Sequence, residues 1–440
     1  MPTPGVSVGA TSSATASTSP SVSVSPSSST ITPTPTPTPT ITIPPYKATP
    51  VAGSKFNNPY SSDEKVRYTV INYMTGLINS AAAGSTVRIA MYSLNVDATK
   101  EAIIAAKLRG VRVQFVTDDH GIGTSQMKEV IAALGTTVTP TGSYISICDF
   151  SCSSDFLSFD LLTGEEIRPY LHAKYLTFSA VGASKNVSLI TSSNFTKTQA
   201  SEGFNNIYTI VGDTVLYNFL QDRFNLMLLD RDDLPAYASM TSGTKKLYFF
   251  PANVGDPLDV ATDPYYGILS NIRCTGVASG YGTYPSSPTK SRTQVRVSMF
   301  QWSKARNYLA RKLKELNNAG CDVKVIMSKL DWDPEVASIL LAPGGKYGNI
   351  EIKNADIDTD KDANLEYFVH NKYILVNGKY LSDSSSKLVF TGSANFTRSA
   401  LRYSNELGVK VDSAATHKSY KANFDLIYNN YSVPQGIWTR

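Results

Sequence analysis

Two of the four histidines in this 440-residue chain lie in a short pattern that occurs twice. His172 and Lys174 belong to Tyr-Leu-His-Ala-Lys-Tyr-Leu, and His370 and Lys372 belong to Phe-Val-His-Asn-Lys-Tyr-Ile. Side chains at positions i and i+2 of a strand point to the same face, so each histidine should share a face with its lysine. Two such faces brought together would offer two imidazoles and two ammonium groups to one small anion.

The elements that must position these residues repeat in the same order. A strand is expected at 85–93 and again at 293–301, a helix at 97–109 and again at 303–318, and a second strand at 111–116 and again at 322–327. A glycine follows each expected helix, as is common at helix ends. The repetition predicts an internal duplication whose halves are each built from β-α-β units.

A second repeated segment follows each His-x-Lys pair. It contains Ser193 and Asn194 in the first half, and Ser393 and Asn395 in the second half. These side chains can donate hydrogen bonds to an anion. The two asparagines could also cap the helical stretches that follow them. Both roles are compatible, because an anion site at a helix start needs the same geometry.

At these residues the chain resembles the phospholipase D superfamily, and in particular secreted bacterial phospholipase D-like proteins. The superfamily signature is His-x-Lys, then Asp after four further residues, then a Gly/Ser-Ser-x-Asn segment. The resemblance spans residues 62–432, although Ser179 and Asn377 stand at the two positions of the signature Asp. It implies an α/β fold with two pseudo-symmetric lobes, each a mixed β-sheet flanked by helices, and an active site at the lobe interface.

The resemblance also implies a division of labour. One neutral imidazole attacks phosphorus and forms a covalent phosphohistidine, while the other, protonated, gives its proton to the departing oxygen. The usual assignment makes His172 the nucleophile and His370 the general acid, with no metal or cofactor. The remaining residues would bind the non-bridging oxygens and stabilise the transition state: Lys174, Ser193, Asn194, Lys372, Ser393 and Asn395.

One asymmetry between the copies suggests how the two histidines differ. In our alignment, Glu406 ends the second copy where Asn206 ends the first. A carboxylate near an imidazole raises its pKa, whereas an amide can orient the ring without doing so. We therefore expect Glu406 to lie beside His370 and keep it charged, and Asn206 to leave His172 neutral.

The function expected on this basis is phosphodiester hydrolysis by a phospholipase D that releases phosphatidate and a head group, with transfer to an alcohol where one intercepts the intermediate. One alternative is a phosphodiesterase acting on DNA or RNA. The other is a non-catalytic phosphate-binding surface protein, which the missing signature Asp residues permit. The net charge of +5 is mild, and no Lys/Arg block is present, so nucleic acid is the less favoured partner. The expected protein is a monomer with peripheral membrane contact.

Two long segments, 149–168 and 251–291, are expected to be loops that carry specificity. Their aromatic rings could enter a lipid interface or stack on nucleic-acid bases: Phe156, Phe159, Tyr265, Tyr266, Tyr281 and Tyr284. Of the two remaining histidines, His120 follows Asp118 and Asp119 at an expected strand end and could lie at the rim of a cleft. A solvated loop is the favoured expectation. His417 lies in an expected helix, 414–428, with no partner that the sequence identifies.

Composition suggests three regions. Residues 1–55 should be a disordered Ser/Thr/Pro-rich stalk or linker, followed by lobes at 62–235 and 243–432. No signal peptide follows Met1, and no run of eighteen apolar residues is present.

The four cysteines are expected to form disulfides rather than a zinc site, whose usual spacing they do not match. We expect the pairs Cys148–Cys152 and Cys274–Cys321. Disulfides and the Ser/Thr/Pro-rich stalk together favour a secreted or cell-surface protein.

Overall fold

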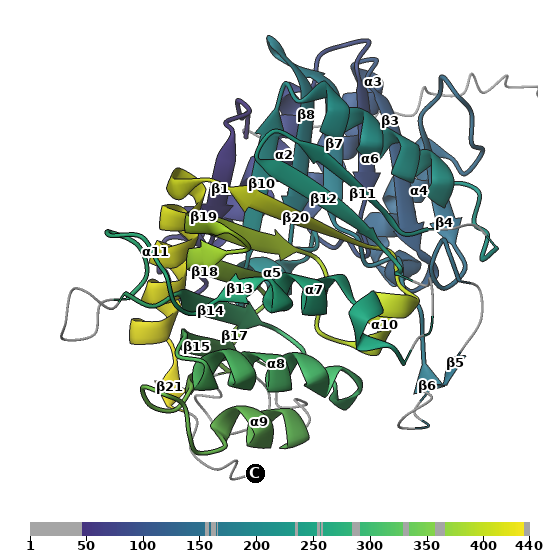
Figure 1. Ribbon diagram of the computed structural model, residues 1–440. Helices are drawn as coiled ribbons and strands as arrows, with labels where there is room; N and C mark the ends of the chain where they lie inside the picture. Colours follow the sequence, from purple (N-terminus) through teal and green to yellow (C-terminus); the bar gives the residue numbers. More distant parts are fainter. Residues whose placement is uncertain are drawn as a thin grey trace, which may run out of the picture. The chain divides into compact units, whose positions relative to one another are not determined.

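The computed structural model contains two large mixed β-sheets, one from each repeated half of the chain (Figure 1). It describes residues 46–434, apart from 155–157, 160–163, 165, 234–235, 253–255, 257, 284–290, 329–333 and 357–365. Residues 41–440 belong to one compact unit. Both sheets combine parallel and antiparallel pairs, so the predicted fold class is confirmed.

The first sheet has a parallel part and an antiparallel part. The strands β2, β3 and β4 are parallel, and β7, β8, β10 and β1 add antiparallel pairs. In the described residues its order is β1 (Gly53–Phe56), β10 (Asn206–Val211), β8 (Ser184–Thr191), β7 (Tyr175–Val181), β2 (Thr86–Ala90), β3 (Arg112–Asp118) and β4 (Tyr144–Cys148).

The second sheet repeats this arrangement and extends it. In the described residues its order is β11 (Ala238–Ser242), β12 (Lys245–Phe250), β20 (Glu406–Asp412), β19 (Asp383–Gly392), β18 (Lys372–Tyr380), β14 (Gln294–Met299), β15 (Asp322–Met327), β16 (Glu351–Asn354) and β21 (Val433–Pro434), with β13 (Ile272–Arg273) paired to β18. The series β20-β19-β18-β14-β15-β16 matches β10-β8-β7-β2-β3-β4. The predicted duplication is therefore present in the strand order itself.

Helices cover both faces of each sheet, which is why the central strands are apolar on both sides. In the first half, Leu176 packs with α2, α3 and α4, while the adjacent Tyr175 packs with α6 on the other face. The helices of this half are α1 (Glu64–Arg67), α2 (Thr69–Ser80), α3 (Asp97–Leu108), α4 (Ser125–Leu134), α5 (Lys197–Ser201) and α6 (Thr214–Met227).

In the second half, α7, α8 and α9 share a core with β14 and β15, while α11 packs on the other face through Tyr420 and Phe424 (Figure 1). The helices are α7 (Pro264–Ser270), α8 (Asn307–Asn318), α9 (Pro334–Leu341), α10 (Arg398–Arg402) and α11 (Ala414–Asn430). A further apolar cluster joins the two sheets, because Leu247 and Leu407 of the second half pack with Tyr208 and Leu220 of the first.

Short strands exchanged between the halves complete the fold. β17 (Phe368–Val369) pairs in parallel with β9 (Gly203–Phe204), and Leu171 forms an equivalent parallel bridge with Asn405. A separate two-stranded ribbon joins β5 (Ser158–Phe159) to β6 (Glu166–Ile167). The exchanged strands are the ones that precede His172 and His370, so each motif is anchored to the opposite half.

Two expectations about segments were wrong. The stalk was placed up to residue 55, but Gly53–Phe56 is strand β1, paired with β10. Tyr265 and Tyr266 are predicted on a specificity loop, but both lie in α7, and Tyr265 packs in the core against Phe250 and Phe396. Residues 1–45, Phe156 and Tyr284 lie outside the described residues. The lobe boundaries at 62–235 and 243–432 remain predictions.

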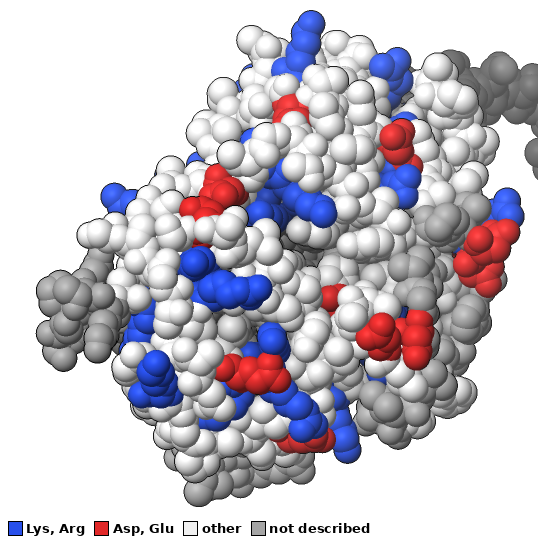
Figure 2. All heavy atoms as spheres, in the orientation of Figure 1, with Lys and Arg blue, Asp and Glu red and all other residues white. Residues whose placement is uncertain are grey.

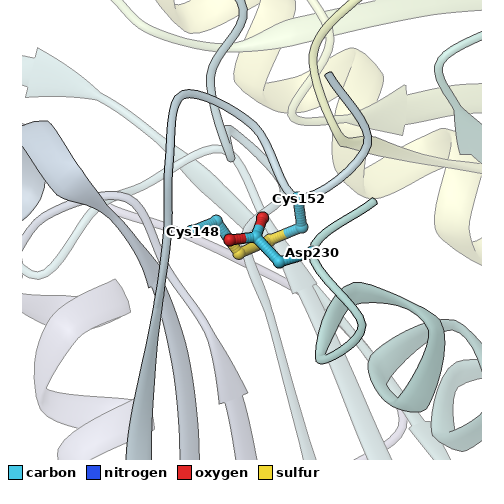
Figure 3. A group of neighbouring side chains, drawn as sticks. All are labelled: Cys148, Cys152 and Asp230. Atoms are coloured by element: carbon cyan, nitrogen blue, oxygen red, sulfur yellow. A yellow bond between two sulfur atoms is a disulfide. The ribbon is translucent and has the colours of Figure 1, made fainter. Parts of the chain in front are cut away.

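Both predicted disulfides are present. The Cα atoms of Cys148 and Cys152 lie 5.0 Å apart, and those of Cys274 and Cys321 lie 4.6 Å apart. Figure 3 shows the first bond with the Asp230 carboxylate beside it. Because the sulfur atoms of Cys148 and Cys152 are bonded to each other, these three residues do not form a cysteine metal site.

Among the described residues, no helix has the length and apolar character needed to cross a bilayer.

Candidate active site

The two histidines are held where the halves exchange strands. The His172 amide donates to the carbonyl of Asn405 over 3.0 Å, and the His370 amide donates to the carbonyl of Phe204 over 3.0 Å. Each imidazole therefore lies beside the polar residues of the other half. The site cannot form from one half alone.

Glu406 is the partner of His172. The Nδ1 atom of His172 lies 2.7 Å from Oε1 of Glu406, and Ser393 Oγ donates to the other carboxylate oxygen. A carboxylate accepts at both oxygens, so Nδ1 carries the hydrogen and Nε2 keeps its lone pair. Glu406 is only 1% exposed, whereas the His172 side chain is 20% exposed. The buried Glu406 therefore fixes the orientation of the His172 ring, and part of that ring remains accessible to a ligand.

Asn205 plays the corresponding part for His370. Its Oδ1 lies 3.1 Å from Nδ1 of His370 and also accepts from Ser192 Oγ at 2.9 Å. Its Nδ2 donates to the carbonyls of Gln199 and Gly203, at 2.8 and 3.1 Å. Since the amide NH2 is engaged there, the oxygen must face His370. This histidine too keeps its lone pair on Nε2.

The expected pairing of Glu406 with His370 is therefore wrong. The β18–β19 hairpin has three more residues than β7–β8 between its histidine and its asparagine. Tyr175 lies opposite Ile190 in the first hairpin, and Tyr373 lies opposite Thr391 in the second. The three additional residues therefore lie between Tyr373 and Thr391.

The register also corrects two equivalences. The structural counterpart of Glu406 is Asn205 rather than Asn206, and that of Ser393 is Ser192 rather than Ser193. The Asn206 amide donates instead to Thr391 Oγ1 and the Tyr420 hydroxyl, at 3.0 and 2.8 Å.

The two lysines are buried beside the histidines. Lys174 donates to the carbonyl of His172, and Lys372 to that of His370, both over 2.8 Å. Burial lowers the pKa of Lys174 to about 7. Burial, and next the charge of Lys174, hold the pKa of Lys372 well below its usual range. The ammonium forms are therefore disfavoured by burial, and a bound anion would stabilise both of them.

The imidazoles belong to the same electrostatic unit. Burial lowers the pKa of His172, and the Glu406 carboxylate opposes this effect. Burial also holds the pKa of His370 well below its usual range, with further lowering by Lys372, Lys174 and His172. The charges of the first half therefore act on the histidine of the second. Both shifts favour the neutral rings before an anion binds.

The predicted asparagines remain available to a ligand. The Oδ1 atoms of Asn194 and Asn395 are buried and have no hydrogen-bond partner in the described structure. The serines are arranged differently, because Ser193 Oγ donates to the carbonyl of Asn194 and Ser393 Oγ donates to Glu406. Their hydroxyl hydrogens therefore hold protein groups in place, and Ser192 and Ser393 orient the partners of the two histidines.

The positions of the missing signature Asp lie away from this site. Ser179 and Asn377 are seven residues beyond the histidines, about 23 Å along an extended strand. Ser179 Oγ accepts from the amide of Thr86 at 2.8 Å, and the Asn377 amide donates to Gln294 at 3.2 Å. Both side chains fasten neighbouring strands. Their replacement of Asp removes no group that faces the imidazoles.

A cleft of about 590 Å³ leads to His172, with Glu406 and Asn395 in its wall. Its other lining residues include Tyr92, Arg168, Tyr170 and Arg398. These four residues lie outside the repeated motifs, so the sequence carries no signal for them. His120 lies near the rim, with Nδ1 3.3 Å from Arg168 and its ring edge-on to Tyr170.

Asp118 is a further residue that the motifs did not reveal. It ends β3 and is buried, and its Oδ2 accepts the amide of Leu171, adjacent to His172, at 2.7 Å. In the second half, Ser328 Oγ accepts the amide of Val369, adjacent to His370, at 2.8 Å. The only signal available in the sequence was their place at equivalent strand ends, where α/β folds commonly form sites.

Comparison with known proteins agrees with this geometry. The family model described as "Cardiolipin synthase, PLD-like domain" matches residues 74–228 and again residues 289–428. The chain belongs to the phospholipase D superfamily. The two matches fall on the two repeated halves, and each includes one His-x-Lys motif. No curated protein matches the chain significantly in sequence.

Solved structures of low sequence identity share the fold. Phosphatidylserine synthase from Haemophilus influenzae Rd KW20 aligns with a TM-score of 0.52 at 11% identity, covering 88% of both chains. Polyphosphate kinase from Porphyromonas gingivalis aligns with a TM-score of 0.52 at 13% identity, covering 88% of this chain and 52% of its own. This protein thus spans about half the length of the kinase.

A smaller superfamily member also matches. Nuc from Salmonella typhimurium, a phospholipase D family member, aligns at 22% identity and a TM-score of 0.27, over 40% of this chain and 93% of its own. Its alignment is too partial to carry an argument. Family membership and the paired histidines support a phosphodiester-related activity for this phospholipase D superfamily protein.

Proposed function

We propose that this enzyme cleaves the phosphodiester of phospholipids through a covalent phosphohistidine, giving phosphatidate and a free head group. The observation that carries the proposal is the pair of imidazoles whose Nδ1 atoms are engaged by Glu406 and Asn205. This leaves two Nε2 atoms for chemistry. Burial lowers the pKa of the two neighbouring lysines, and a bound phosphodiester anion would favour their charged forms.

In the first step, the lone pair on Nε2 of His172 attacks phosphorus. The bond from phosphorus to the head-group oxygen breaks, and protonated His370 gives its proton to that oxygen. Lys174, Lys372 and the amides of Asn194 and Asn395 bind the non-bridging oxygens. The products of this step are the free head-group alcohol and phosphatidyl-His172.

In the second step, a water molecule gives a proton to His370 as its oxygen attacks phosphorus. The phosphorus–nitrogen bond breaks, its electron pair returns to His172, and phosphatidate leaves. An alcohol in place of water would give a new phosphodiester by the same route. Hydrolysis and transfer therefore share one intermediate.

Glu406 supports the assignment of His172 as the nucleophile, for a different reason from the one expected at first. Attack at Nε2 leaves a positive charge on the His172 ring, and a carboxylate 2.7 Å from Nδ1 stabilises that charge. Asn205 carries no charge, so protonated His370 remains a stronger acid and gives up its proton more readily. His370 must first gain this proton, and a bound phosphodiester anion favours that gain.

A lipid substrate is supported by the charge distribution and by the disulfides. Figure 2 shows basic and acidic residues interspersed on the face it displays, without the continuous basic track that nucleic acid requires. Two disulfides suit an oxidising compartment outside the cytosol. We propose a secreted or surface-attached monomer that contacts membranes peripherally.

The test is a substrate panel with the full chain in the presence of chelator. Phosphatidylcholine vesicles should yield phosphatidate, and added ethanol should divert part of it to phosphatidylethanol. His172→Gln should abolish both products, while Lys185→Gln, which replaces an exposed residue outside the cleft, should retain them. Plasmid nicking without lipid turnover would overturn the lipid assignment in favour of a nuclease. Phosphate binding without turnover of any diester would favour a non-catalytic protein.

A transferase is a second candidate, because the matching family model is described as cardiolipin synthase. Such an enzyme would use a lipid alcohol rather than water to attack the intermediate. Vesicles of phosphatidylglycerol separate the two functions. A hydrolase releases phosphatidate from them, whereas a transferase joins two lipids into cardiolipin and releases glycerol.

A further inference from the structure

A second polar groove lies between α11 and β19, and we call it the α11 groove. Its volume is about 430 Å³, and it is lined by Lys387, Ala414, His417, Lys418, Lys421 and Asp425, with one further alanine. Lys387 precedes the end of β19 by five residues, about 16 Å of extended strand. The catalytic segments follow the end of β19, so the α11 groove is separate from the cleft at His172.

His417 is the unusual member of this groove. It is only 4% exposed, yet it lines the groove, and no described residue forms a hydrogen bond with its ring. Buried polar groups in proteins are almost always hydrogen-bonded. A nearly buried imidazole that faces a groove without a protein partner is therefore positioned to meet a ligand.

The charges that act on the His417 ring are positive. Lys387 comes from β19, Lys421 from α11 itself, and Arg296 from β14, where it is paired with Asp322. Burial, followed by these three charges, lowers the pKa of His417 to about 3. The acidic residue of the groove, Asp425, is engaged by Lys421. The empty groove is thus electropositive.

The groove also includes the start of α11. This helix runs for seventeen residues from Ala414, which lies in the groove wall. The first amides of a helix have no carbonyl partner within it, and its N-terminus carries a partial positive charge. The side chain of the N-cap residue Ser413 accepts from the amide of Thr416, and its carbonyl accepts from the amide of His417. Amides at the helix start can therefore add to the lysines and His417 in holding an anion.

We propose that the α11 groove binds a phosphate dianion, either free orthophosphate or the phosphomonoester of a lipid head group. A tetrahedral oxyanion presents several acceptors at once, which suits amides, ammonium groups and an imidazole that surround a small volume. The groove is a single compact cluster, whereas nucleic acid needs a longer track. This inference goes beyond the reaction at the cleft and does not depend on it.

The ring of His417 provides a direct readout. The chain has four histidines, so their ring signals in an NMR spectrum can be assigned with one substitution for each. Without phosphate, the His417 signal should not titrate between pH 5 and 8. With orthophosphate, it should shift saturably, and its pKa should rise because the bound dianion favours the protonated ring. The ring signals of His172 and His370 report separately on any phosphate that binds at the catalytic site.

Two double variants, each of which removes two positive charges, test where the phosphate binds. Lys387→Gln combined with Lys418→Gln should weaken the phosphate effect on His417 by about tenfold or more. Lys128→Gln combined with Lys185→Gln, on exposed positions of the first half, should leave it unchanged. Vesicles containing phosphatidate, compared with phosphatidylcholine alone, distinguish a lipid source from free phosphate. A response to either source supports the proposal.

Three results would overturn the proposal. The His417 signal could fail to respond to orthophosphate and to phosphatidate alike. It could respond equally in the groove variant and in the control variant. A response to a single-stranded oligonucleotide without any response to phosphate would show that the groove recognises a different class of ligand.

Discussion

The two half-sites of this enzyme share a scaffold and differ in one functional group. In each half-site, a histidine is followed by a buried lysine. The Nδ1 atom of the histidine contacts a side chain of the other half, and a serine contacts that same side chain. That side chain is the carboxylate of Glu406 for His172 and the amide of Asn205 for His370. The duplication supplied two equivalent imidazoles, and this difference makes them chemically unequal.

Burial acts on both halves in the same direction, so it cannot account for different roles. It lowers the pKa of both histidines and of both lysines. Only the carboxylate is specific to one histidine. A group that develops positive charge during reaction belongs beside it, and a group that must release a proton belongs beside the amide.

The largest effect should come from removing the nucleophile. His172→Gln should reduce turnover by about 10⁵-fold or more for every phosphodiester, because no covalent intermediate forms. His370→Gln should reduce turnover by a similar factor when the leaving group is an alkyl alcohol. It should reduce the burst of nitrophenol from a nitrophenyl diester far less, because that leaving group needs no proton. Stopped-flow kinetics on both substrates would measure this. A burst that survives in His172→Gln and is lost in His370→Gln would reverse the roles.

Next in size should be the effect of neutralising the carboxylate. Glu406→Gln should lower kcat by about 10³-fold, because the amide can turn its NH2 toward His172 and no longer stabilises a charged ring. Asn205→Ala, the matched change in the other half, should cost only about tenfold, because it removes a neutral contact. Steady-state kinetics of the two variants test this order. Equal losses would show that the carboxylate has no special part.

Exchanging the two groups sharpens the comparison further. In the double variant Asn205→Asp with Glu406→Gln, the carboxylate moves from His172 to His370. The pKa of His370 should rise, since an adjacent negative charge favours its protonated form. NMR titration of the two rings should show this rise relative to the Glu406→Gln single variant. An unchanged pKa of His370 would mean that Asn205 does not control it.

The sequence predicted the fold and most of the site because the duplication repeats both the elements and the reactive residues. The pairs His172–Lys174 and His370–Lys372 occupy matching places, as their repetition indicated. The sequence could not identify the partner of each histidine. That partner comes from the opposite half, through the exchange of strands at β9 and β17. The true equivalent of Glu406 is Asn205 rather than Asn206, because each lies eleven positions after the asparagine of its motif.

Other features depended on tertiary context. Tyr265 belongs to an aromatic-rich segment that is typical of a loop, yet α7 turns its ring into the core against Phe250. Asp118 and Ser328 share no residue type, although they support equivalent backbone amides. Only their positions in the two sheets show that they correspond.

The smallest expected effect concerns the pH dependence of anion binding. Lys174 has a pKa of about 7, so it is charged below that pH and neutral above it. Competitive inhibition by sulfate, whose own charge is constant, should therefore weaken as pH rises through 7. Lys174→Arg keeps its charge at high pH and should remove this dependence. Inhibition by sulfate that is constant from pH 6 to 9 in the parent enzyme would exclude a titrating Lys174.

The central claim is that His172, supported by Glu406, becomes phosphorylated during turnover. Mixing the enzyme with excess substrate, quenching in alkali to preserve a phosphorus–nitrogen bond, and mapping the adduct by mass spectrometry would test it most directly. The account predicts a single adduct on the peptide that contains His172. An adduct on His370, or turnover without any phosphohistidine, would contradict it.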